Sequence, residues 1–542
     1  MWRLAGVQVS ESTDAIMMPM TERATIRRRA VACALLFSLY FPIVVALQWR
    51  SNAFRSELAG TADEPAHYVT GLLIHDYISA GIPGNPISYA RNFYAHYPKV
   101  ALGHWPPFFY VVQAAWTLPF TPSRTSVILL MAALTALLAT VLCQTIWKEF
   151  SLGAGIAVAI LLLSLPVIEE FSTLVMSEIL LTLLVLSAVL AYGRYLDTER
   201  WQSAAWFGVW ATLALLTKAT GIELAFVPLC AVLAGRRWRL LRRFSFWLPA
   251  ILVVGIAGPW YLWVPGAQHE SVIRFGAVQF VFFRLTATPK VWWEMLGVAP
   301  AILAIAGLRI FRGPASGKWL SGLSVLLGAY VFRFLVGAWE DRHLVTGVPI
   351  LLMFSVAGAT WLLSRISARW KIAIVGAAVA ALVGFNISRS PLKRHYGYDE
   401  AAQKIVSNPQ FAKSVVLVCG AAIGEGALIS EIAMRESRPG HYVLRATKLL
   451  AISDWMGWNY RALFNNPADT MQYVEAIPAG IVVIDGDGRS SPHGRLLFEG
   501  LRHHPEKWDL LADDGGILVF HLIGHESRPV AKIPIPVPST EK

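Results

Sequence analysis

The run TSVILLMAALTALLATVLCQTIW, residues 125–147, contains no charged side chain and decides the class of fold. A helix needs roughly 20 consecutive apolar residues to cross the hydrocarbon core of a bilayer. Comparable runs recur in a chain of which 55% is hydrophobic and only 15% is charged. They lie near 31–48, 152–168, 179–193, 202–217, 222–235, 245–264, 291–311, 319–338, 343–363 and 371–388. The sequence therefore predicts a polytopic α-helical membrane protein with about eleven spans.

Basic residues gather in the short loops between these runs, as in GRRWRLLRR at 235–243 and SRISARWK at 364–371. Cytoplasmic loops of membrane proteins carry an excess of Lys and Arg. Both loops fall on the cytoplasmic side only if the segment HWPPFFYVVQAAWTLPF, residues 104–120, does not cross the bilayer. We therefore expect 104–120 to form an interfacial or re-entrant helix. The net charge of +12 then reflects topology, and a nucleic-acid partner is not expected.

The two ends of the chain differ from its middle. Residues 1–30 end in three arginines and are interpreted as a cytoplasmic tail before an uncleaved membrane anchor. Residues 31–388 form the membrane domain, with a large external loop at 49–124. From 389 to 542 the apolar runs shorten to strand length, as in SVVLVCG and AGIVVIDG. The pattern of this part predicts an extracytoplasmic α/β domain with a disordered, Pro-rich tail. We expect the protein to lie in the inner (cytoplasmic) membrane.

Ionisable residues in the apolar runs gather at one end of them. On the expected topology this is the outer end, and the centres of the spans hold almost no charge. A charge at the centre of a span costs about 2.5–3.5 kcal/mol on insertion scales, and secondary transporters place their ligands there. The one-sided set favours an enzyme that acts at the membrane surface, although such charges also snorkel to the interface. The set comprises Glu169, Glu170, Glu178, Lys218, Glu223, Glu294, Arg333, Glu340, Asp341 and Arg342.

The motif DEPAH, residues 63–67, opens a helix in the first external loop. Asp63 suits the N-cap position and Pro65 the first turn, and the helix is expected to run to about Ala80. Residues four apart share a face of a helix, so Asp63 shares its face with His67, Gly71 and His75. A cap alone explains Asp63, but not the second acid, Glu64, or the two histidines. The residues therefore leave open a structural cap and a catalytic acid.

Six short stretches together resemble the C-type (GT-C) glycosyltransferase superfamily. The similarity is greatest to lipid-A aminoarabinose transferases, protein O-mannosyltransferases and Rgt-type lipopolysaccharide glycosyltransferases. The stretches are weakly specific one by one, but their order and their common place at the outer face are more specific. They are DEPAH (63–67), HWPPFFY (104–110), Arg124, MSEILLTLL (176–184), LTKATG (216–221) and DRHLVTGVP (341–349).

The resemblance implies a polyprenyl-phosphate sugar as donor and a lipid, glycan or protein acceptor at the bilayer surface. By position, Asp63 would be the general base, with Glu64 supporting it or holding a cation. Lys218 and Arg124 match residues near the donor phosphate, and Arg342 is a further match. Substrate contacts are implied for His67, His104, Glu178 and His343. Of these, Glu178 stands where the superfamily usually has Asp, and His104 stands where its branches vary.

The chemistry of such a transfer agrees with these residue types. A base must lie within hydrogen-bond reach of the acceptor hydroxyl, and cations must lie where charge grows on the leaving phosphate. Direct displacement would invert the anomeric centre. Lys and Arg can serve without a metal, although Asp63 and Glu64 also permit a divalent cation such as Mg²⁺ or Mn²⁺. The sequence has no GxGxxG, Walker A or paired CxxC motif that would support a nucleotide donor or structural zinc.

Two readings from other classes remain beside the glycosyltransferase. A lipid-linked glycan flippase or transporter would be expected to carry charges at the middle of its spans, and these are missing here. An O-antigen-type polymerase or ligase would share the charges at the outer face. It would not share the acidic first loop with its DEPAH motif.

Overall fold

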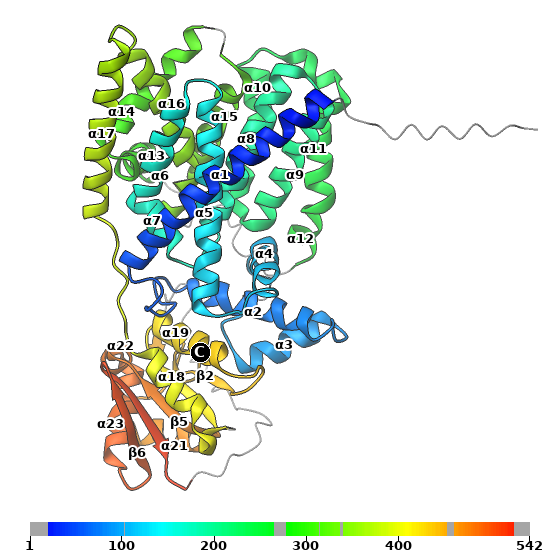
Figure 1. The fold of residues 1–542 in the computed structure, drawn as a ribbon. Coiled ribbons are helices and arrows are strands. Elements are labelled where there is room, and N and C mark those ends of the chain that lie inside the picture. The colour runs from blue at the N-terminus through cyan, green and yellow to red at the C-terminus, as the bar shows by residue number, and fades with distance from the viewer. Residues whose placement is uncertain are drawn as a thin grey trace, which may run out of the picture.

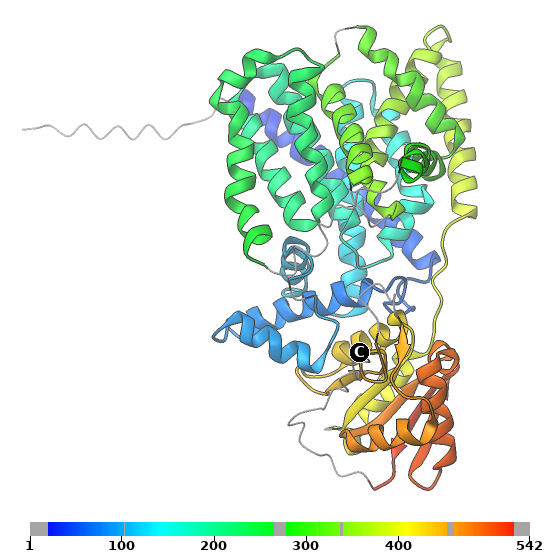
Figure 2. The same cartoon turned by 180° about the vertical axis from the view of Figure 1, so that it is seen from behind.

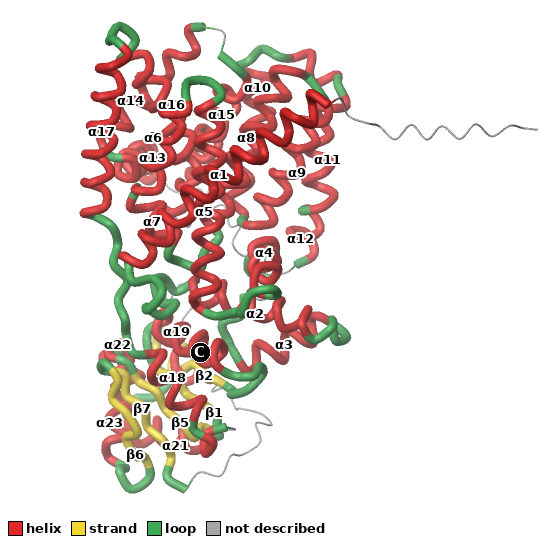
Figure 3. Tube along the Cα trace, viewed as in Figure 1, coloured by secondary structure: helices red, strands yellow, loops and turns green. Residues whose placement is uncertain are grey.

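The computed structural model describes residues 20–524 apart from 102, 265–277, 314, 336–339, 413 and 453–459. A large helical part stands above a smaller part that contains the β-sheet, and the helices α2 to α4 lie between them (Figure 1). Figure 3 shows that the strands are confined to the smaller part. The predicted fold class, a helical membrane protein with a C-terminal α/β domain, is thus confirmed.

All the predicted apolar runs fall on helices of the upper part. Helix α8 lies at its centre and is buried along most of its length, because apolar side chains cover every face of it. The helices are α1 (Met20–Arg50), α5 (Arg124–Trp147), α6 (Leu152–Ser164), α7 (Pro166–Ser172), α8 (Glu178–Thr198), α9 (Trp201–Thr217), α10 (Phe226–Leu233), α11 (Phe244–Ile256), α12 (Gly258–Trp263), α13 (Val278–Leu296), α14 (Val298–Gly307), α15 (Gly317–Leu335), α16 (Val348–Leu362) and α17 (Ala368–Ser388), with 3₁₀ turns η1 (Ala219–Ala225), η2 (Trp238–Arg242), η4 (Leu308–Arg312) and η5 (Asp341–Gly347).

Among the described residues, five helices are long and apolar enough to cross a membrane. They are Ala30–Arg50, Arg124–Trp147, Glu178–Thr198, Asp341–Leu362 and Ala368–Ser388. Two bent pairs raise the number to seven if each is one span. Helices α6 and α7 meet at 69°, and the α13 and α14 pair is bent by 116°. The other predicted runs fall on α9, α10, α11 and α15. Taken singly, none of these four helices is both long and apolar enough to be counted as a membrane-spanning helix.

Three short helices build the first loop: α2 (Glu64–Ser79), α3 (Pro86–His96) and α4 (Phe108–Thr117). At a rise of 1.5 Å per residue, the 10 residues of α4 reach about 15 Å, half the thickness of a bilayer core. Helix α4 packs against α2, so the segment 104–120 folds back along the loop. Seen from behind, α2 and α3 lie between the two parts of the molecule (Figure 2).

The α/β domain is built on a five-stranded sheet with the order β2-β1-β5-β7-β6. Strands β1 (Val415–Cys419), β2 (Val443–Arg445) and β5 (Ala479–Ile484) run parallel, whereas β7 (Ile517–Leu522) is antiparallel to β5 and β6 (Trp508–Asp514). Strands β1 and β5 are buried throughout because helices cover both faces. The other elements are α18 (Tyr398–Ser407), η6 (Pro409–Phe411), α19 (Ala422–Arg435), α20 (Ala446–Leu449), β3 (Ala451–Ile452), β4 (Arg461–Ala462), α21 (Pro467–Ala476), α22 (Gly486–Ser490) and α23 (Pro492–His503).

The α/β domain is docked on the first loop through α19, which packs against α2. Arg438, just beyond α19, binds Asp76 of α2 through two hydrogen bonds of 2.7 and 2.9 Å. The Tyr97 hydroxyl, after α3, donates to Glu436 at 2.5 Å. These contacts hold the loop that carries Asp63 between the membrane part and the domain.

Candidate active site

Asp63 occupies the N-cap position of α2, as predicted, but its carboxylate does not cap the helix. Instead, Oδ2 accepts a hydrogen bond of 2.7 Å from Nη2 of Arg342, which lies in η5. Burial raises the pKa of this carboxyl, but the charge and hydrogen bond of Arg342 outweigh burial and hold the pKa below its usual range. Asp63 is therefore ionised at neutral pH, and 30% of its side chain stays exposed.

Two cations from distant segments meet at this point. Lys218 follows the last turn of α9, and its Nζ donates to Oε1 of Glu178 at 2.7 Å. Arg342 Nε lies 3.7 Å from the same oxygen, and this guanidinium also pairs with Glu340. The structure thus brings together four residues that the sequence predicted: Asp63, Glu178, Lys218 and Arg342.

Glu178 opens α8 and is almost fully buried between the two cations. Its Oε2 has no hydrogen-bond partner among the described residues. An unsatisfied buried carboxylate oxygen is costly in a folded protein. Glu178 Oε2 can therefore accept a hydrogen bond from a bound group such as a substrate hydroxyl.

Glu64 points away from this group. Its side chain is fully buried, with Oε2 accepting from the Gly60 amide at 2.8 Å and Oε1 from the Val175 amide at 3.1 Å. Lys393 Nζ binds the same Oε1 at 3.2 Å. Since both oxygens have these partners, Asp63 and Glu64 are not arranged as a joint pair of metal ligands. Glu64 instead ties the first loop to the turn before α8 and to the segment that leads into the α/β domain.

The face of α2 that carries the histidines packs on α4. The His67 ring stacks on Trp105 with a centroid distance of 4.2 Å, and its Nδ1 lies 2.9 Å from the Tyr110 hydroxyl. Burial lowers the pKa of His67 to about 4, so the ring is neutral at physiological pH. His75 Nδ1 lies 3.0 Å from the Thr117 hydroxyl. The spacing that places His67 and His75 on one face of α2 thus serves the packing of α2 on α4. His67 lies one helical turn after Asp63.

The remaining predicted contacts lie around this group. His104 contacts the edge of Trp105, at a centroid distance of 5.2 Å, and so borders the His67 stack. His343 follows Arg342 in η5 and lies close enough to Lys218 and Arg342 to feel their charges.

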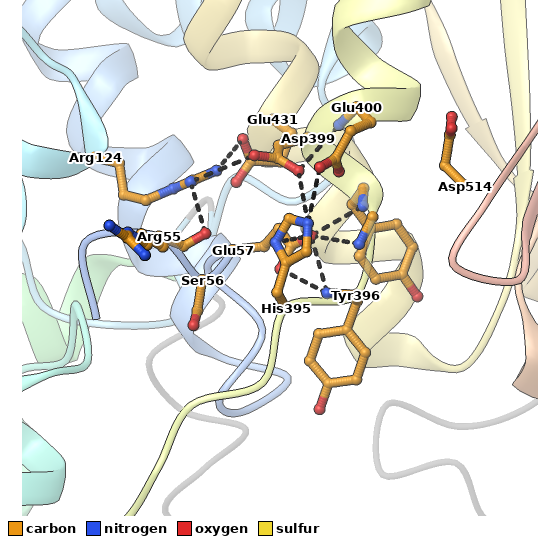
Figure 4. Close-up of polar contacts among 12 residues, drawn as sticks. Arg55, Ser56, Glu57, Arg124, His395, Tyr396, Asp399, Glu400, Glu431 and Asp514 are labelled. Atoms are coloured by element: carbon orange, nitrogen blue, oxygen red, sulfur yellow. Dashed lines mark hydrogen bonds and ion pairs between the residues drawn. The ribbon is translucent and has the colours of Figure 1, made fainter. Parts of the chain in front are cut away.

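Arg124 does not join this group. Its Nη2 lies 2.7 Å from Oε2 of the buried Glu431 in α19, and its Nη1 lies 3.6 Å from Asp399 in α18. Nη1 also donates to the Arg55 carbonyl at 3.3 Å. Figure 4 shows these contacts, with the Arg124 side chain reaching from α5 toward the acids of the α/β domain. Arg124 therefore fastens the domain to the membrane part.

The same junction contains a candidate metal group that the sequence did not suggest. Ligand atoms of Glu57, His395, Asp399 and Glu400 all lie within 4.8 Å of one another. Within this group His395 binds Glu400 at 2.8 Å, and Glu57 Oε1 accepts from the amides of Gly397 and Tyr398 at 2.7 and 3.0 Å. The side chains thus satisfy one another as they stand. No sequence signal could have found the group, because Glu57 is some 340 residues from its partners.

A sequence profile of the family described as dolichyl-phosphate-mannose-protein mannosyltransferase matches residues 104–263. No curated protein sequence matches the chain significantly.

Solved structures match over most of the chain. Apo ArnT from Cupriavidus metallidurans has 16% identity and a TM-score of 0.61, covering 91% of this chain and 98% of its own. ArnT bound to undecaprenyl phosphate has 15% identity and a TM-score of 0.59, covering 91% and 99%. The Archaeoglobus fulgidus oligosaccharyltransferase in complex with Zn and sulfate has 14% identity and a TM-score of 0.53, covering 87% and 71%. The chain therefore has the GT-C fold, as the resemblance in its motifs implied.

Proposed function

We propose that this protein is a membrane glycosyltransferase that moves a sugar from a polyprenyl-phosphate donor to an acceptor hydroxyl at the outer face of the cytoplasmic membrane. One observation carries the proposal. An ionised, partly exposed carboxylate, Asp63, binds Arg342, and Arg342 shares the buried Glu178 with a second cation, Lys218. The GT-C fold, the match to a mannosyltransferase family and the undecaprenyl phosphate bound by the similar ArnT support the choice of donor.

In this reaction the acceptor hydroxyl gives its proton to the Asp63 carboxylate. The acceptor oxygen forms a bond to the anomeric carbon on the face opposite the phosphate, and the bond between that carbon and the phosphate oxygen breaks. Polyprenyl phosphate leaves with the electron pair, so the anomeric centre is inverted. Because its pKa is held low, Asp63 is ionised when each cycle begins and can accept the proton.

Lys218 and Arg342 would bind the leaving phosphate as its charge increases. Glu178 now holds both cations through one oxygen. Glu178 would hold both cations in place between cycles. It would compete only weakly with a phosphate for these cations, because no further hydrogen-bond donor among the described residues reaches its buried carboxylate. His67, Trp105 and Tyr110 form the adjoining wall, where a neutral imidazole and an aromatic face fit a sugar or lipid better than a charged group.

The proposal assigns no metal to Asp63 and Glu64, because Glu64 is held by two amides and Lys393. A divalent cation bound only by Asp63 and substrate phosphate would be compatible with the site, since Mg²⁺ is commonly held by one or two carboxylates plus phosphate oxygens.

The test is transfer by purified protein in nanodiscs, with a panel of undecaprenyl-phosphate pentoses and hexoses as donors and a total membrane glycolipid and glycoprotein fraction as acceptors. Release of undecaprenyl phosphate is measured separately from transfer. We expect at least one donor to be cleaved by the wild type and not by Asp63→Asn. If no donor in the panel is cleaved, the proposed function is wrong. If Asp63→Asn cleaves a donor as fast as the wild type, Asp63 is not the base.

A further inference from the structure

The α/β domain forms a wall directly beside the start of α2. Helix α19 comes so close at Gly426 that a Cβ there would lie 2.7 Å from Lys99 Cε and 3.0 Å from Pro65 Cγ. Because such contacts are too short for carbon atoms, a side chain at 426 would displace the end of the Lys99 side chain from its position. Lys99, in the loop after α3, is thus enclosed between the first loop and the domain.

The Lys99 ammonium lies next to the candidate base. Nζ donates to the carbonyl of Ala62, the residue before Asp63, at 3.1 Å. Across the described ranges of the chain, no carboxylate oxygen lies within ion-pair distance of this ammonium. Its nearest acids are engaged elsewhere, since Glu425 is bound by Arg445 at 2.7 Å and Asp63 by Arg342.

Positive charge predominates on this side of Asp63. Lys99 is within electrostatic reach of Arg445 and Lys448 from the α/β domain, and of two carboxylates, Glu425 and Asp63, that already bind arginines. Burial, and after it the charge of Arg445, lowers the pKa of Lys99 to about 8. A buried cation without an acid is costly, and a bound anion would remove that cost.

The position of these cations relates them to the acceptor rather than to the donor. The donor phosphate is assigned to Lys218 and Arg342, and Arg342 approaches Asp63 from the membrane part. The acceptor must reach the same carboxylate from a side that Arg342 does not occupy. The side formed by Ala62, Lys99 and α19 is open to it, since Lys99 keeps part of its surface exposed and Lys448 is exposed.

Building on the proposed function, we propose that the acceptor is anionic, with a phosphate or carboxylate group that binds Lys99 while its hydroxyl faces Asp63. Arg445 and Lys448 lie at the edge of this site and add to its positive field. An ammonium binds either anion as a point charge, so the shared chemistry is the oxyanion. The α/β domain is then part of the acceptor site, because it supplies two of the three cations and the glycine that makes room for the third.

The test uses the full-length protein and the donor cleaved by the wild type. The acceptor is a membrane glycolipid extract in five forms: untreated, dephosphorylated with hydrofluoric acid, methyl-esterified at its carboxylates, neutralised by both treatments, and delipidated. Lys99→Gln is the informative variant because an amide can still donate to the Ala62 carbonyl. Lys99→Arg keeps the charge. Lys404→Gln is the matched control, because Lys404 pairs with Asp514 on the domain surface, away from the site.

We expect Lys99→Gln to raise the KM for the untreated extract at least tenfold, with kcat within threefold and donor KM unchanged. Lys99→Arg and Lys404→Gln should stay within threefold of the wild type. Loss of activity on dephosphorylation identifies a phosphate, and loss on esterification a carboxylate. Activity retained after delipidation identifies the glycan rather than the lipid headgroup as the source.

An unchanged acceptor KM in Lys99→Gln would overturn the proposal. So would equal use of the extract after both neutralising treatments. A second measurement does not depend on the folding of any variant: the untreated extract should protect Lys99 of the wild type from acetylation at pH 8, and the doubly neutralised extract should not. Failure of the proposed function is distinguishable, because the wild type would then cleave no donor at all.

Discussion

Two arginine-centred clusters lie at the end of the membrane part that faces the α/β domain, and they differ in what their acids bind. Around Arg342, Asp63 stays 30% exposed and one oxygen of Glu178 has no partner. Around Arg124, the acid Glu57 is fully buried and accepts hydrogen bonds from consecutive backbone amides of the segment that enters α18. The first cluster presents a partly exposed carboxylate, whereas the acids of the second join the membrane part to the α/β domain.

The difference shows why residue type and location together were not enough to assign a role. Both arginines were expected at the donor phosphate, and both lie at the outer ends of helices. Only Arg342 lies beside an exposed carboxylate and a second cation. Arg124 is paired with Glu431 and Asp399 of the α/β domain.

The largest effect is expected on transfer activity, from a change at Asp63 in the Arg342 cluster. Asp63→Asn should reduce transfer by about 10²–10⁴-fold, because it removes the general base. Thermal stability in detergent should fall only modestly, since Asp63 makes no cap hydrogen bond and an asparagine oxygen can still accept from Arg342 in place of the ion pair. Steady-state transfer and a melting curve measure the two quantities. Glu64→Gln should reduce transfer less, and near-normal turnover of Asp63→Asn would make Asp63 a structural residue like those around Arg124.

The next effect concerns the donor. Lys218→Ala should raise the donor KM by about 10–100-fold, because a hydrogen bond to a charged group contributes about 1.5–3 kcal/mol. Acceptor KM should stay the same. Initial rates over a range of donor concentrations test this, with Lys290→Ala as a control, since Lys290 makes only an exposed pair with Glu294. An unchanged donor KM would remove Lys218 from the site.

A smaller effect is expected at the junction. Arg124→Met should leave donor KM within about twofold but lower the free energy of unfolding by about 1–3 kcal/mol. The loss stays in that range because Arg435 still pairs with Glu431 when Arg124 is gone. Limited proteolysis at the domain boundary and a melting curve would report it. A donor KM that rises as much as in Lys218→Ala would instead return Arg124 to the phosphate site.

The smallest effect is a pH dependence of the junction. Burial lowers the pKa of His395, but Glu57, Glu400 and Asp399 outweigh it and raise the pKa above 6.5. The contribution of the protonated ring is therefore complete below pH 6.5 and is lost as pH rises through the folded-state pKa. Because the ring is 41% exposed, we expect less than about 1 kcal/mol. The slope of stability against pH between 6 and 8 should flatten in His395→Gln, and an equal slope in both proteins would exclude this linkage.

Much of the fold could be predicted because it depends on local patterns. Apolar runs mark the helices of the membrane part, and α2 begins and ends within a residue of the boundaries expected from Asp63 and the following glycines. The meeting of Asp63, Glu178, Lys218 and Arg342 was also predictable, because the family resemblance assigns all four to one site.

The rest depended on contacts that no local pattern encodes. Glu64 follows Asp63 directly, but successive residues on a helix point about 100° apart, so its side chain faces Lys393 instead of Arg342. The histidines of α2 were buried by α4, whose docking depends on Gln113 fitting beside Gly71. Arg124 and Lys99 owe their environments to α19, which lies more than 290 residues further along the chain.

The bond between Glu64 and Lys393 also has a consequence for the synthesis of the protein. Lys393 is 329 residues downstream of Glu64, and a ribosome adds about 5–20 residues per second. For roughly 15–65 s, therefore, the nascent chain carries Glu64 beside the loop of Asp63 without its cation. The loop receives its final support only after every membrane helix has been inserted and the C-terminal domain has begun to emerge. Chains that stop before residue 393 therefore lack one of the contacts that hold the loop of Asp63 in place.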